Sequence, residues 1–266
     1  MADTVDLLGD DVLTDALITR SLPEAMEGKL YDSKALEIGV FAFFGISGLA
    51  EVHFESVQDI GERAYISCED LEVLDFPEAV SIGTYAFATL KGIREASFPK
   101  VTEIGDHAFS NCTNLVSAWF PEATVVNASA FSSCPALEVV ELPKVEVVMS
   151  YAFSSCSLLK RVVLPLCETI SGCFSSCSSL EKVFLPALVS ITAEGCFNYD
   201  SKLKEINIGS GISDIHASAF KGTPSGLVIN LGVSEGAVDG APWGAEDAVI
   251  NYDVPYVGPE DEESGS

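Results

Sequence analysis

A pattern close to Ile-Gly-x-x-Ala-Phe-x-x-Cys-x-x-Leu-x-x-Val-x-Leu-Pro returns nine times in this chain, almost always after 22 residues. Its first apolar position is filled in turn by Ile38, Ile60, Ile82, Ile104, Val126, Val148, Ile170, Ile191 and Ile215. A fixed period of this length is typical of stacked arrays, in which no single unit can bury its own apolar face. The repeat therefore predicts one elongated domain whose function depends on a long surface.

Each repeat predicts a short β-strand close to its end. In the second repeat, Leu74 and Phe76 alternate with Val73 and Asp75, which places the first pair toward the core and the second pair outward. Pro77 follows at once and ends the strand, because proline lacks a backbone donor. Successive strands should then form a parallel ladder with a spacing of about 4.8 Å.

The Ile-Gly and Ala-Phe pairs predict the remainder of each repeat. Gly61 and its equivalents fit a tight turn that needs either a positive φ or a close backbone approach. The Ala-Phe pair predicts a helical or irregular turn, with the aromatic ring filling the space between layers. We therefore expect an α/β repeat solenoid of about nine repeats of 22 residues, with a parallel β-sheet on one face.

The eight cysteines all fall in interior columns of the repeat. One column, three residues after the aromatic, holds Cys68, Cys112, Cys134, Cys156 and Cys177. Ile46 and Leu90 fill the same column in other repeats, so it accepts any mid-sized apolar side chain, and a free Cys packs as one. We interpret the cysteines as reduced core thiols rather than bridges or ligands, and expect neither a metal nor a cofactor.

Segments such as Val101–Leu115, which reads Val-Thr-Glu-Ile-Gly-Asp-His-Ala-Phe-Ser-Asn-Cys-Thr-Asn-Leu, resemble the BspA-like leucine-rich repeat. The resemblance covers about Ala35 to Gly232. It implies a curved solenoid, no catalysis, and binding or adhesive roles, usually at bacterial surfaces. The ending Gly222–Asn230, followed by Gly240–Ala245, looks like the end-cap of members of this family in phages and prophages.

The two ends of the chain depart from the repeat and predict caps. Residues 1–33 are expected to form an N-terminal cap, in which Asp11–Arg20 is an amphipathic helix that closes the stack or serves as a docking handle. The leucine-rich repeat solenoid is expected over 34–232 and a C-terminal cap over 233–253. The acidic run within 254–266 predicts a disordered tail.

The formal net charge of -26 bears on the partners. Phosphates would be repelled, so we expect no binding to nucleic acid or to an anionic membrane surface. No apolar stretch is long enough to span a bilayer, and the acidic residues of 1–11 do not fit a secretion signal. We expect no membrane insertion; cell-surface, virion-associated and cytoplasmic locations stay open, as does the oligomeric state.

The outward strand positions are the candidate binding surface. Trp119 and Phe184 fall in one outward column, where a purely structural strand needs no aromatic side chain. Acidic side chains predominate in the first half of this face and basic ones in the second. The predicted binding residues are Trp119, Phe184, Arg161, Lys182, Val163, Glu141 and Lys160. The structural alternative is that Trp119 only packs on its neighbours in the sheet.

The sequence offers little chemistry for catalysis. It contains no Gly-x-Ser-x-Gly and no His-Glu-x-x-His, and its three histidines sit at unrelated repeat positions. We predict a non-enzymatic binding or adhesion module that recognises a protein or glycan at a bacterial cell or virion surface through its strand face. Two alternatives are a phage or prophage tail or fibre component, held by its caps, and a cytoplasmic interaction scaffold.

Overall fold

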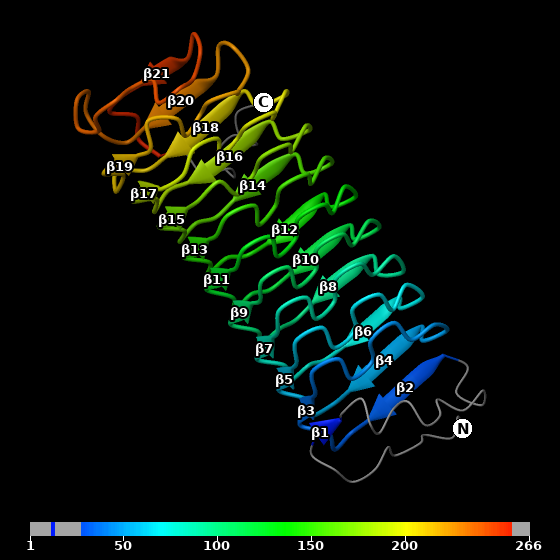
Figure 1. The fold of residues 1–266 in the computed structure, drawn as a ribbon. Coiled ribbons are helices and arrows are strands. Elements are labelled where there is room, and N and C mark those ends of the chain that lie inside the picture. The colour runs from blue at the N-terminus through cyan, green and yellow to red at the C-terminus, as the bar shows by residue number, and fades with distance from the viewer. Residues whose placement is uncertain (1–11, 14–27, 257–266) are drawn as a thin grey trace, which may run out of the picture.

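Stacked turns of the chain form an elongated solenoid in the computed structural model, which describes residues 12–13 and 28–256 (Figure 1). Each turn contributes strands to two series that run along different sides of the stack. All strand pairs are parallel, and neighbouring strands come from successive turns. The structure confirms the predicted repeat solenoid and its parallel ladder, and adds a second ladder that the sequence pattern did not indicate.

The longer strands form three consecutive parallel sheets on the side that we call the strand face. They are β2 (Lys29–Asp32), β4 (Glu51–Phe54) and β6 (Val73–Asp75); β8 (Glu95–Ser97), β10 (Ser117–Trp119) and β12 (Val139–Glu141); and β14 (Arg161–Val163), β16 (Lys182–Leu185), β18 (Glu205–Ile208), β20 (Val228–Leu231) and β21 (Val249–Asn251). As predicted, Phe76 is buried while Val73 and Asp75 are exposed; Leu74 is half-buried. Pairing is interrupted between β6 and β8 and between β12 and β14.

A ten-stranded ladder of two-residue strands runs along the other side. Its strands are β1 (Val12–Leu13), β3 (Glu37–Ile38), β5 (Asp59–Ile60), β7 (Ser81–Ile82), β9 (Glu103–Ile104), β11 (Val125–Val126), β13 (Val147–Val148), β15 (Thr169–Ile170), β17 (Ser190–Ile191) and β19 (Asp214–Ile215). From β3 onward, the second residue of each strand is the buried first apolar position of the repeat. Strands this short show no alternation in the sequence, which is why the pattern did not predict them.

A continuous column of stacked rings fills the core, as the repeat predicts. The rings of Phe43 and Tyr65 lie 4.7 Å apart between centroids, and the column continues with spacings between 5.2 and 5.8 Å to Phe220. Trp243 closes it in an edge contact, 6.2 Å from Phe220. Each ring is buried by the turns on either side, so the stability of one repeat depends on its neighbours.

The turns that follow the Ile-Gly pairs are irregular, and the described part of the chain contains no helix, so the α component of the predicted α/β class is wrong. Two residues in a typical turn have positive φ, such as His107 at 55° and Asn111 at 59°. Alternate turn amides bond to the next repeat, as Phe109 N does to Ala130 O at 2.7 Å, while those between them close tight turns, as Ala108 N does to Gly105 O at 3.1 Å. Donors used between repeats cannot close a helix within one repeat.

The glycine of the Ile-Gly pair allows close approach of the backbone in the first repeats. A Cβ added at Gly105 would lie 2.4 Å from the carbonyl oxygen of Ile82 in the preceding turn, and one at Gly83 would lie 2.7 Å from the amide nitrogen of Glu62. Of the two roles that the sequence left open for these glycines, positive φ or close backbone approach, the structure shows close approach. A side chain at Gly83 or Gly105 would therefore meet the backbone of the preceding turn, whereas Asn127 and Met149 fill the equivalent place in later turns.

The predicted helix over Asp11–Arg20 is wrong where it can be compared. Val12–Leu13 forms β1, which pairs in parallel with β3 and extends the ladder of short strands by one rung. The other residues of the predicted helix lie outside the described part of the chain. β1 pairs with the edge of β3, so the backbone groups of that edge need no amphipathic helix to cover them.

Every cysteine is a buried free thiol in the column where the repeat places it. Four successive thiols of the main column, from Cys112 to Cys177, lie 3.1 to 3.2 Å from the carbonyl oxygen of a core Phe in the preceding repeat. Burial raises the pKa of Cys68 to about 11 and that of Cys167 to about 12. Thiols of this kind are poor nucleophiles, which agrees with a packing role.

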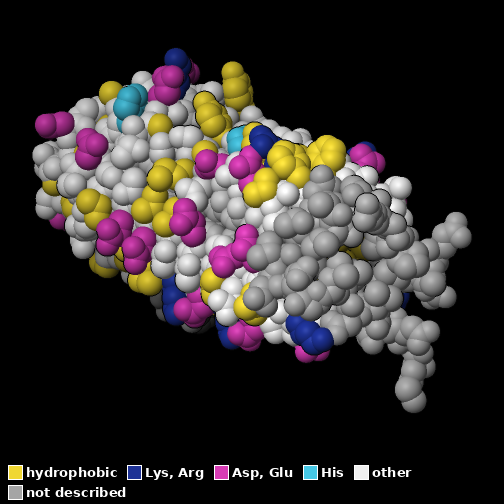
Figure 2. Space-filling model, turned by 60° about the horizontal axis from the view of Figure 1, so that its bottom comes forward, with side chains coloured by type: hydrophobic (Ala, Val, Ile, Leu, Met, Phe, Trp, Pro, Cys, Tyr) yellow, Lys and Arg dark blue, Asp and Glu magenta, His cyan; other side chains and the backbone are white. Residues whose placement is uncertain are grey.

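β21 and the segment around Trp243 form the C-terminal end of the stack in the described chain. β21 adds to β20 at the end of the third sheet, and Trp243 is fully buried with its indole Nε1 donating to Asp239 O at 2.7 Å. Among the described residues, no helix is long and apolar enough to cross a membrane. Asp and Glu side chains are spread over the face seen in Figure 2, with few Lys and Arg among them.

Candidate functional site

The strand face presents two outward rows of side chains, from the first and the third residue of each strand. The third residues form what we call the outer row, which reads Tyr31, His53, Asp75, Ser97, Trp119, Glu141, Val163, Phe184, Asn207, Asn230 and Asn251. The parallel register sets these residues side by side, for example Ser97, Trp119 and Glu141 on β8, β10 and β12. One long row can therefore be contacted by a single extended partner.

Trp119 is the largest exposed side chain of the outer row, at 39 % exposure. It borders a recess of about 420 Å³ that spans β6, β8 and β10. Phe76 and Leu74 supply apolar lining to this recess, and Pro77 and Pro99 line it beyond the strand ends. The predicted outward position of Trp119 is confirmed, and part of its side chain lines the recess.

The recess lies across the interruption between β6 and β8. Glu72 and Asp75 line one side of it and Glu95 the other, and all three side chains are exposed. These carboxylates were recognised in the sequence only as part of an acidic half. The structure brings them together with Trp119, because the register sets residues that are 22 apart in the sequence beside one another.

Further toward the N-terminal end, the strand face is acidic but internally paired. His53 Nδ1 lies 3.0 Å from Asp75 Oδ2, and the His53 ring stacks on Tyr31 with centroids 4.5 Å apart. Lys29 Nζ lies 3.0 Å from Glu51 Oε1, and this hydrogen bond lowers the pKa of Glu51 below its usual value. Of the recess carboxylates, Asp75 is thus engaged by His53, whereas Glu72 and Glu95 form no ion pair with another described residue.

Phe184 does not fit the predicted patch. It lies in the outer row on β16, in register with Val163 and Asn207, yet its side chain is fully buried. The guanidinium of Arg161 lies over the ring, 5.0 Å from its centroid. The prediction that Phe184 is an exposed contact residue is thus wrong, because its ring is covered although its strand position points outward.

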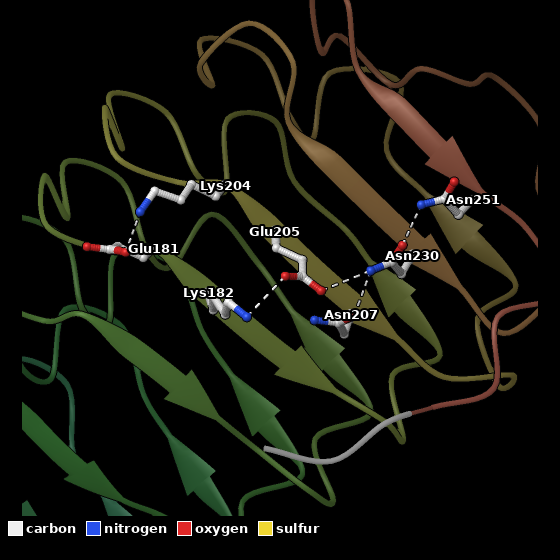
Figure 3. A network of polar contacts seen from close by, with 7 residues as sticks. All are labelled: Glu181, Lys182, Lys204, Glu205, Asn207, Asn230 and Asn251. Atoms are coloured by element: carbon white, nitrogen blue, oxygen red, sulfur yellow. Dashed lines mark hydrogen bonds and ion pairs between the residues drawn. The ribbon is translucent and has the colours of Figure 1, made fainter. Parts of the chain in front are cut away.

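The basic side chains of the second half are joined to acidic partners that the sequence interpretation did not include (Figure 3). Lys182 Nζ lies 3.3 Å from Glu205 Oε2, and Lys204 Nζ lies 2.6 Å from Glu181 Oε2. Lys204 also lowers the pKa of Glu181 below its usual value. Such pairs could have been predicted from the sequence, because the Lys and the Glu of each pair lie 23 residues apart, in neighbouring repeats.

An asparagine ladder ends the outer row (Figure 3). Asn251 Nδ2 donates to Asn230 Oδ1 at 2.7 Å, and Asn230 Nδ2 donates to Asn207 Oδ1 at 2.8 Å and to Glu205 Oε1 at 3.1 Å. The ladder connects the last three strands through their side chains. These hydrogen bonds use amide groups that could otherwise bind a ligand. They therefore stabilise this end of the face and leave fewer polar groups there for a partner.

The predicted binding residues therefore separate into two groups. Glu141 is exposed on β12 next to Trp119, in register with it. Arg161 and Lys160 are exposed, and Val163 and Lys182 half-buried, around the covered Phe184. Within the described ranges, no three His, Cys, Asp or Glu side chains are placed to hold a metal ion.

Comparison with known proteins identifies the repeat. The model of the BspA type leucine rich repeat region matches residues 30–138 and 124–233, with six copies of the repeat. Repeats of this kind generally serve as binding modules. No curated protein matches the sequence significantly.

Several solved structures are similar to this chain. A leucine-rich cell surface protein of Faecalibacterium prausnitzii A2-165 is 18% identical, with 88% of this chain and 80% of that chain covered and a TM-score of 0.40. A leucine-rich repeat protein of T. pallidum is 30% identical, with 53% and 72% covered and a TM-score of 0.46. One from Bacteroides ovatus ATCC 8483 is 18% identical, with 84% and 83% covered and a TM-score of 0.41.

Proposed function

Because the chain belongs to the BspA-type leucine-rich repeat family, we propose that it is a non-enzymatic module that binds a protein or glycan at a bacterial cell or virion surface. The contact is made by the strand face around Trp119. The observation that carries this proposal is an exposed indole, 39 % accessible, at the edge of a recess of about 420 Å³ lined by carboxylates. An aromatic side chain in such surroundings is the usual anchor of a binding surface.

The recess has the chemistry for a ligand with hydrogen-bond donors and a flat apolar side. Trp119 can stack on a sugar ring or on a Lys or Arg side chain, and Glu72, Asp75 and Glu95 accept hydrogen bonds from sugar hydroxyls or cationic groups. The net charge of -26 favours a ligand that is neutral or basic. Nucleic acid is disfavoured on the same ground.

The position of Trp119 in the middle strands supports a contact through the face. A purely architectural component would be held by its two ends, and its central strands would need no exposed aromatic group. The turns also carry exposed aromatic side chains, among them Tyr199 and the neighbouring Phe41 and Phe44, whose ring centroids lie 5.8 Å apart. The recess beside Trp119 is what favours the strand face over these turns.

The test is binding of the labelled protein to intact bacterial cells. Wild type, Trp119→Ala and Tyr199→Ala are compared; Tyr199 is a matched control because it is an aromatic residue with 70 % exposure in a turn. We expect saturable binding that Trp119→Ala abolishes and Tyr199→Ala leaves intact. Equal binding by all three proteins would reject the strand face as the site.

The salt dependence of the same binding distinguishes the two ligand classes. Binding to a basic protein segment should weaken steeply as ionic strength rises, because the carboxylates of the recess are then screened. Binding to a neutral glycan should change little with salt and should be inhibited by soluble fragments of cell-wall polysaccharide.

A further inference from the structure

One column of turn residues, which we call the turn column, carries side chains that stack on the surface of the solenoid. Each member comes directly before the Ala of an Ala-Phe pair or its equivalent, and all have a positive φ between 55° and 60°. Up to the fifth member, each amide donates to the carbonyl oxygen of the residue before the next member, at 2.9 to 3.0 Å. The side chains therefore leave the backbone in the same direction. The members are Phe41, Arg63, Tyr85, His107, Ser129 and Tyr151.

The first four members form a stack of planar groups. The guanidinium of Arg63 lies 5.5 Å from the ring centroid of Phe41 and 5.1 Å from that of Tyr85. Tyr85 in turn stacks on His107, with centroids 4.4 Å apart and ring planes 5° apart. Phe41 is exposed and the other three are half-buried, so this stack belongs to the surface and is separate from the column of rings in the core.

Ser129 interrupts the stack. Its side chain is too short to reach the ring level, and the next planar group of the column is Tyr151, two repeats beyond His107. Two repeats correspond to about 10 Å at the usual strand spacing, which is the room that one planar group takes between two rings. Tyr151 is 58 % exposed, whereas Tyr85, which has a planar neighbour on both faces, is half-buried. Ser129 thus leaves a slot for one planar group.

A recess of about 310 Å³ adjoins the slot on the side of β9 and β11. Glu103, Asn127 and Asp106, the residue before His107, line part of it. Glu103 Oε1 accepts a hydrogen bond from Asn127 Nδ2 at 2.7 Å, and Asp106 Oδ1 accepts one from Ala128 N at 3.0 Å. Both carboxylates are exposed, and neither forms an ion pair with another described residue. Each therefore keeps an oxygen that can accept from a ligand.

The filled interval of the same column indicates which group fits the slot. Between Phe41 and Tyr85 the occupant is a guanidinium, and Arg63 is also ion-paired with Glu62 at the edge of the stack. The slot offers the same combination of two rings and a carboxylate, that of Asp106. A guanidinium stacks on aromatic faces and bonds to carboxylates in its own plane, which an ammonium does not. The net charge of -26 also favours a cationic partner.

We propose that the slot over Ser129, between His107 and Tyr151, binds the guanidinium of an arginine side chain presented by a partner protein. Asp106 and Glu103 accept its hydrogen bonds. The site lies in the turns that follow β9, β11 and β13, neighbours in the ladder of short strands (Figure 1). It is therefore separate from the recess on the strand face and gives the solenoid a second contact, which selects arginine.

The probes for the test are two labelled peptides of equal charge, one of alternating Arg and Gly and one of alternating Lys and Gly. Fluorescence anisotropy gives their affinities for the full chain at physiological ionic strength. The lysine peptide measures the attraction to the overall negative charge, which both peptides share. We expect the arginine peptide to bind several-fold more tightly, because only its side chains stack in the slot.

Two variants remove the slot in different ways. Ser129→Phe fills it with a ring, which the backbone accommodates because Phe41 and Tyr151 have the same positive φ. Tyr151→Ala removes one wall. We expect each variant to bind the two peptides equally. Tyr199→Ala, the control, removes an exposed tyrosine from another turn position, and Trp119→Ala removes the indole of the strand face; both should keep the preference for arginine.

Equal affinities of the two peptides for the wild type would overturn the proposal, as would a preference that persists in Tyr151→Ala. Loss of the preference in Trp119→Ala would assign it to the strand face instead. Thermal unfolding of each variant reports whether the solenoid is intact. Hydroxyl-radical footprinting of the wild type gives a second readout that needs no substitution: the arginine peptide should protect Tyr151 several-fold and leave Tyr199 unchanged, and unchanged labelling of Tyr151 would contradict binding in the slot.

Discussion

Trp119 and Phe184 occupy the same outward row of one parallel stack, three strands apart, yet Trp119 is 39 % exposed and Phe184 is fully buried. Around Trp119 the ladder is interrupted nearby and a recess of about 420 Å³ opens. Around Phe184 the five-stranded sheet is continuous and Arg161 lies over the ring. Strand periodicity sets the direction of a side chain, whereas its exposure depends on what lies above the sheet.

The two halves also differ in how their charged groups are used. At the Trp119 end, exposed carboxylates line a cavity and face no lysine within it. At the Phe184 end, lysines and glutamates pair between repeats and continue into an asparagine ladder. The first end leaves acceptor groups for a ligand, whereas the charged and amide groups of the second end bond to one another, so the experiments below compare the ends.

The largest expected effect lies in the core beneath the Phe184 end. Asp200 fills the place that Cys112 and Cys134 hold near Trp119, and its Oδ1 accepts a hydrogen bond from Cys177 N at 2.7 Å. Burial raises the pKa of Asp200 from 3.8 to about 8, against the smaller opposing effect of that hydrogen bond. The neutral acid is therefore the form that the folded chain accommodates.

This pKa predicts that stability falls as pH rises. Below its unfolded pKa Asp200 is protonated in both states; between pH 3.8 and about 8 only the folded state keeps the proton, so unfolding is increasingly favoured across that window. The loss reaches at most about 6 kcal/mol, at about 1.4 kcal/mol per pKa unit. Denaturant titrations from pH 5 to pH 9 should show this slope in wild type and a flatter one in Asp200→Asn and Asp200→Cys; parallel curves would contradict the assignment.

Much of this architecture could be predicted from the repeat. The column of rings from Phe43 to Phe220 and the burial of Phe76 beside exposed Asp75 follow from residue spacing alone, because every turn repeats the same contacts. The second ladder could not be predicted, since two residues such as Glu37 and Ile38 carry no periodicity. The helical turn was wrong because amide donors of the turns are used between repeats.

The candidate site was predicted only in part, because the repeat gives the direction of a side chain but not its surroundings. Trp119 could be placed outward by column, and the acidic residues near it were visible, but their meeting in one recess depends on the break between β6 and β8, which no single repeat encodes. Phe184 shares the column of Trp119, so sequence reasoning gave both the same role. The burial of Phe184 beneath the Arg161 guanidinium is a contact that the column pattern alone does not indicate.

The next effect concerns affinity at the Trp119 end. Trp119→Ala should lower affinity for the surface ligand by about 2 kcal/mol or more, which is about 30-fold, because an aromatic anchor contributes this much to binding. Since the side chain is outside the core, the free energy of unfolding should change by less than about 0.5 kcal/mol. Titration of labelled protein on cells, with denaturant curves of both proteins, checks the pair of values; a stability loss equal to the binding loss would make Trp119 a structural residue.

Phe184→Ala should show the opposite pattern. Its ring is buried outside the main core, so we expect a stability loss of about 1–2 kcal/mol, well below the 3–5 kcal/mol of a core Phe→Ala change. Phe174→Ala is the matched core substitution, because Phe174 belongs to the column of stacked rings in the core. If Phe184→Ala lowers cell binding as much as Trp119→Ala does, the two ends act as one site and the contrast between them fails.

The smallest effect concerns the carboxylates of the recess. Glu72→Gln and Glu95→Gln each remove one exposed charge from its lining, and each should weaken binding of a basic ligand by about 0.2–1 kcal/mol. Screening should erase this difference near 1 M salt, where the Debye length is about 3 Å. Glu122→Gln is the matched control, because it changes the net charge equally while Glu122 pairs with Lys144 outside the recess. If Glu122→Gln weakens binding as much as the recess variants do, the ligand senses the overall charge of the stack and not the lining beside Trp119.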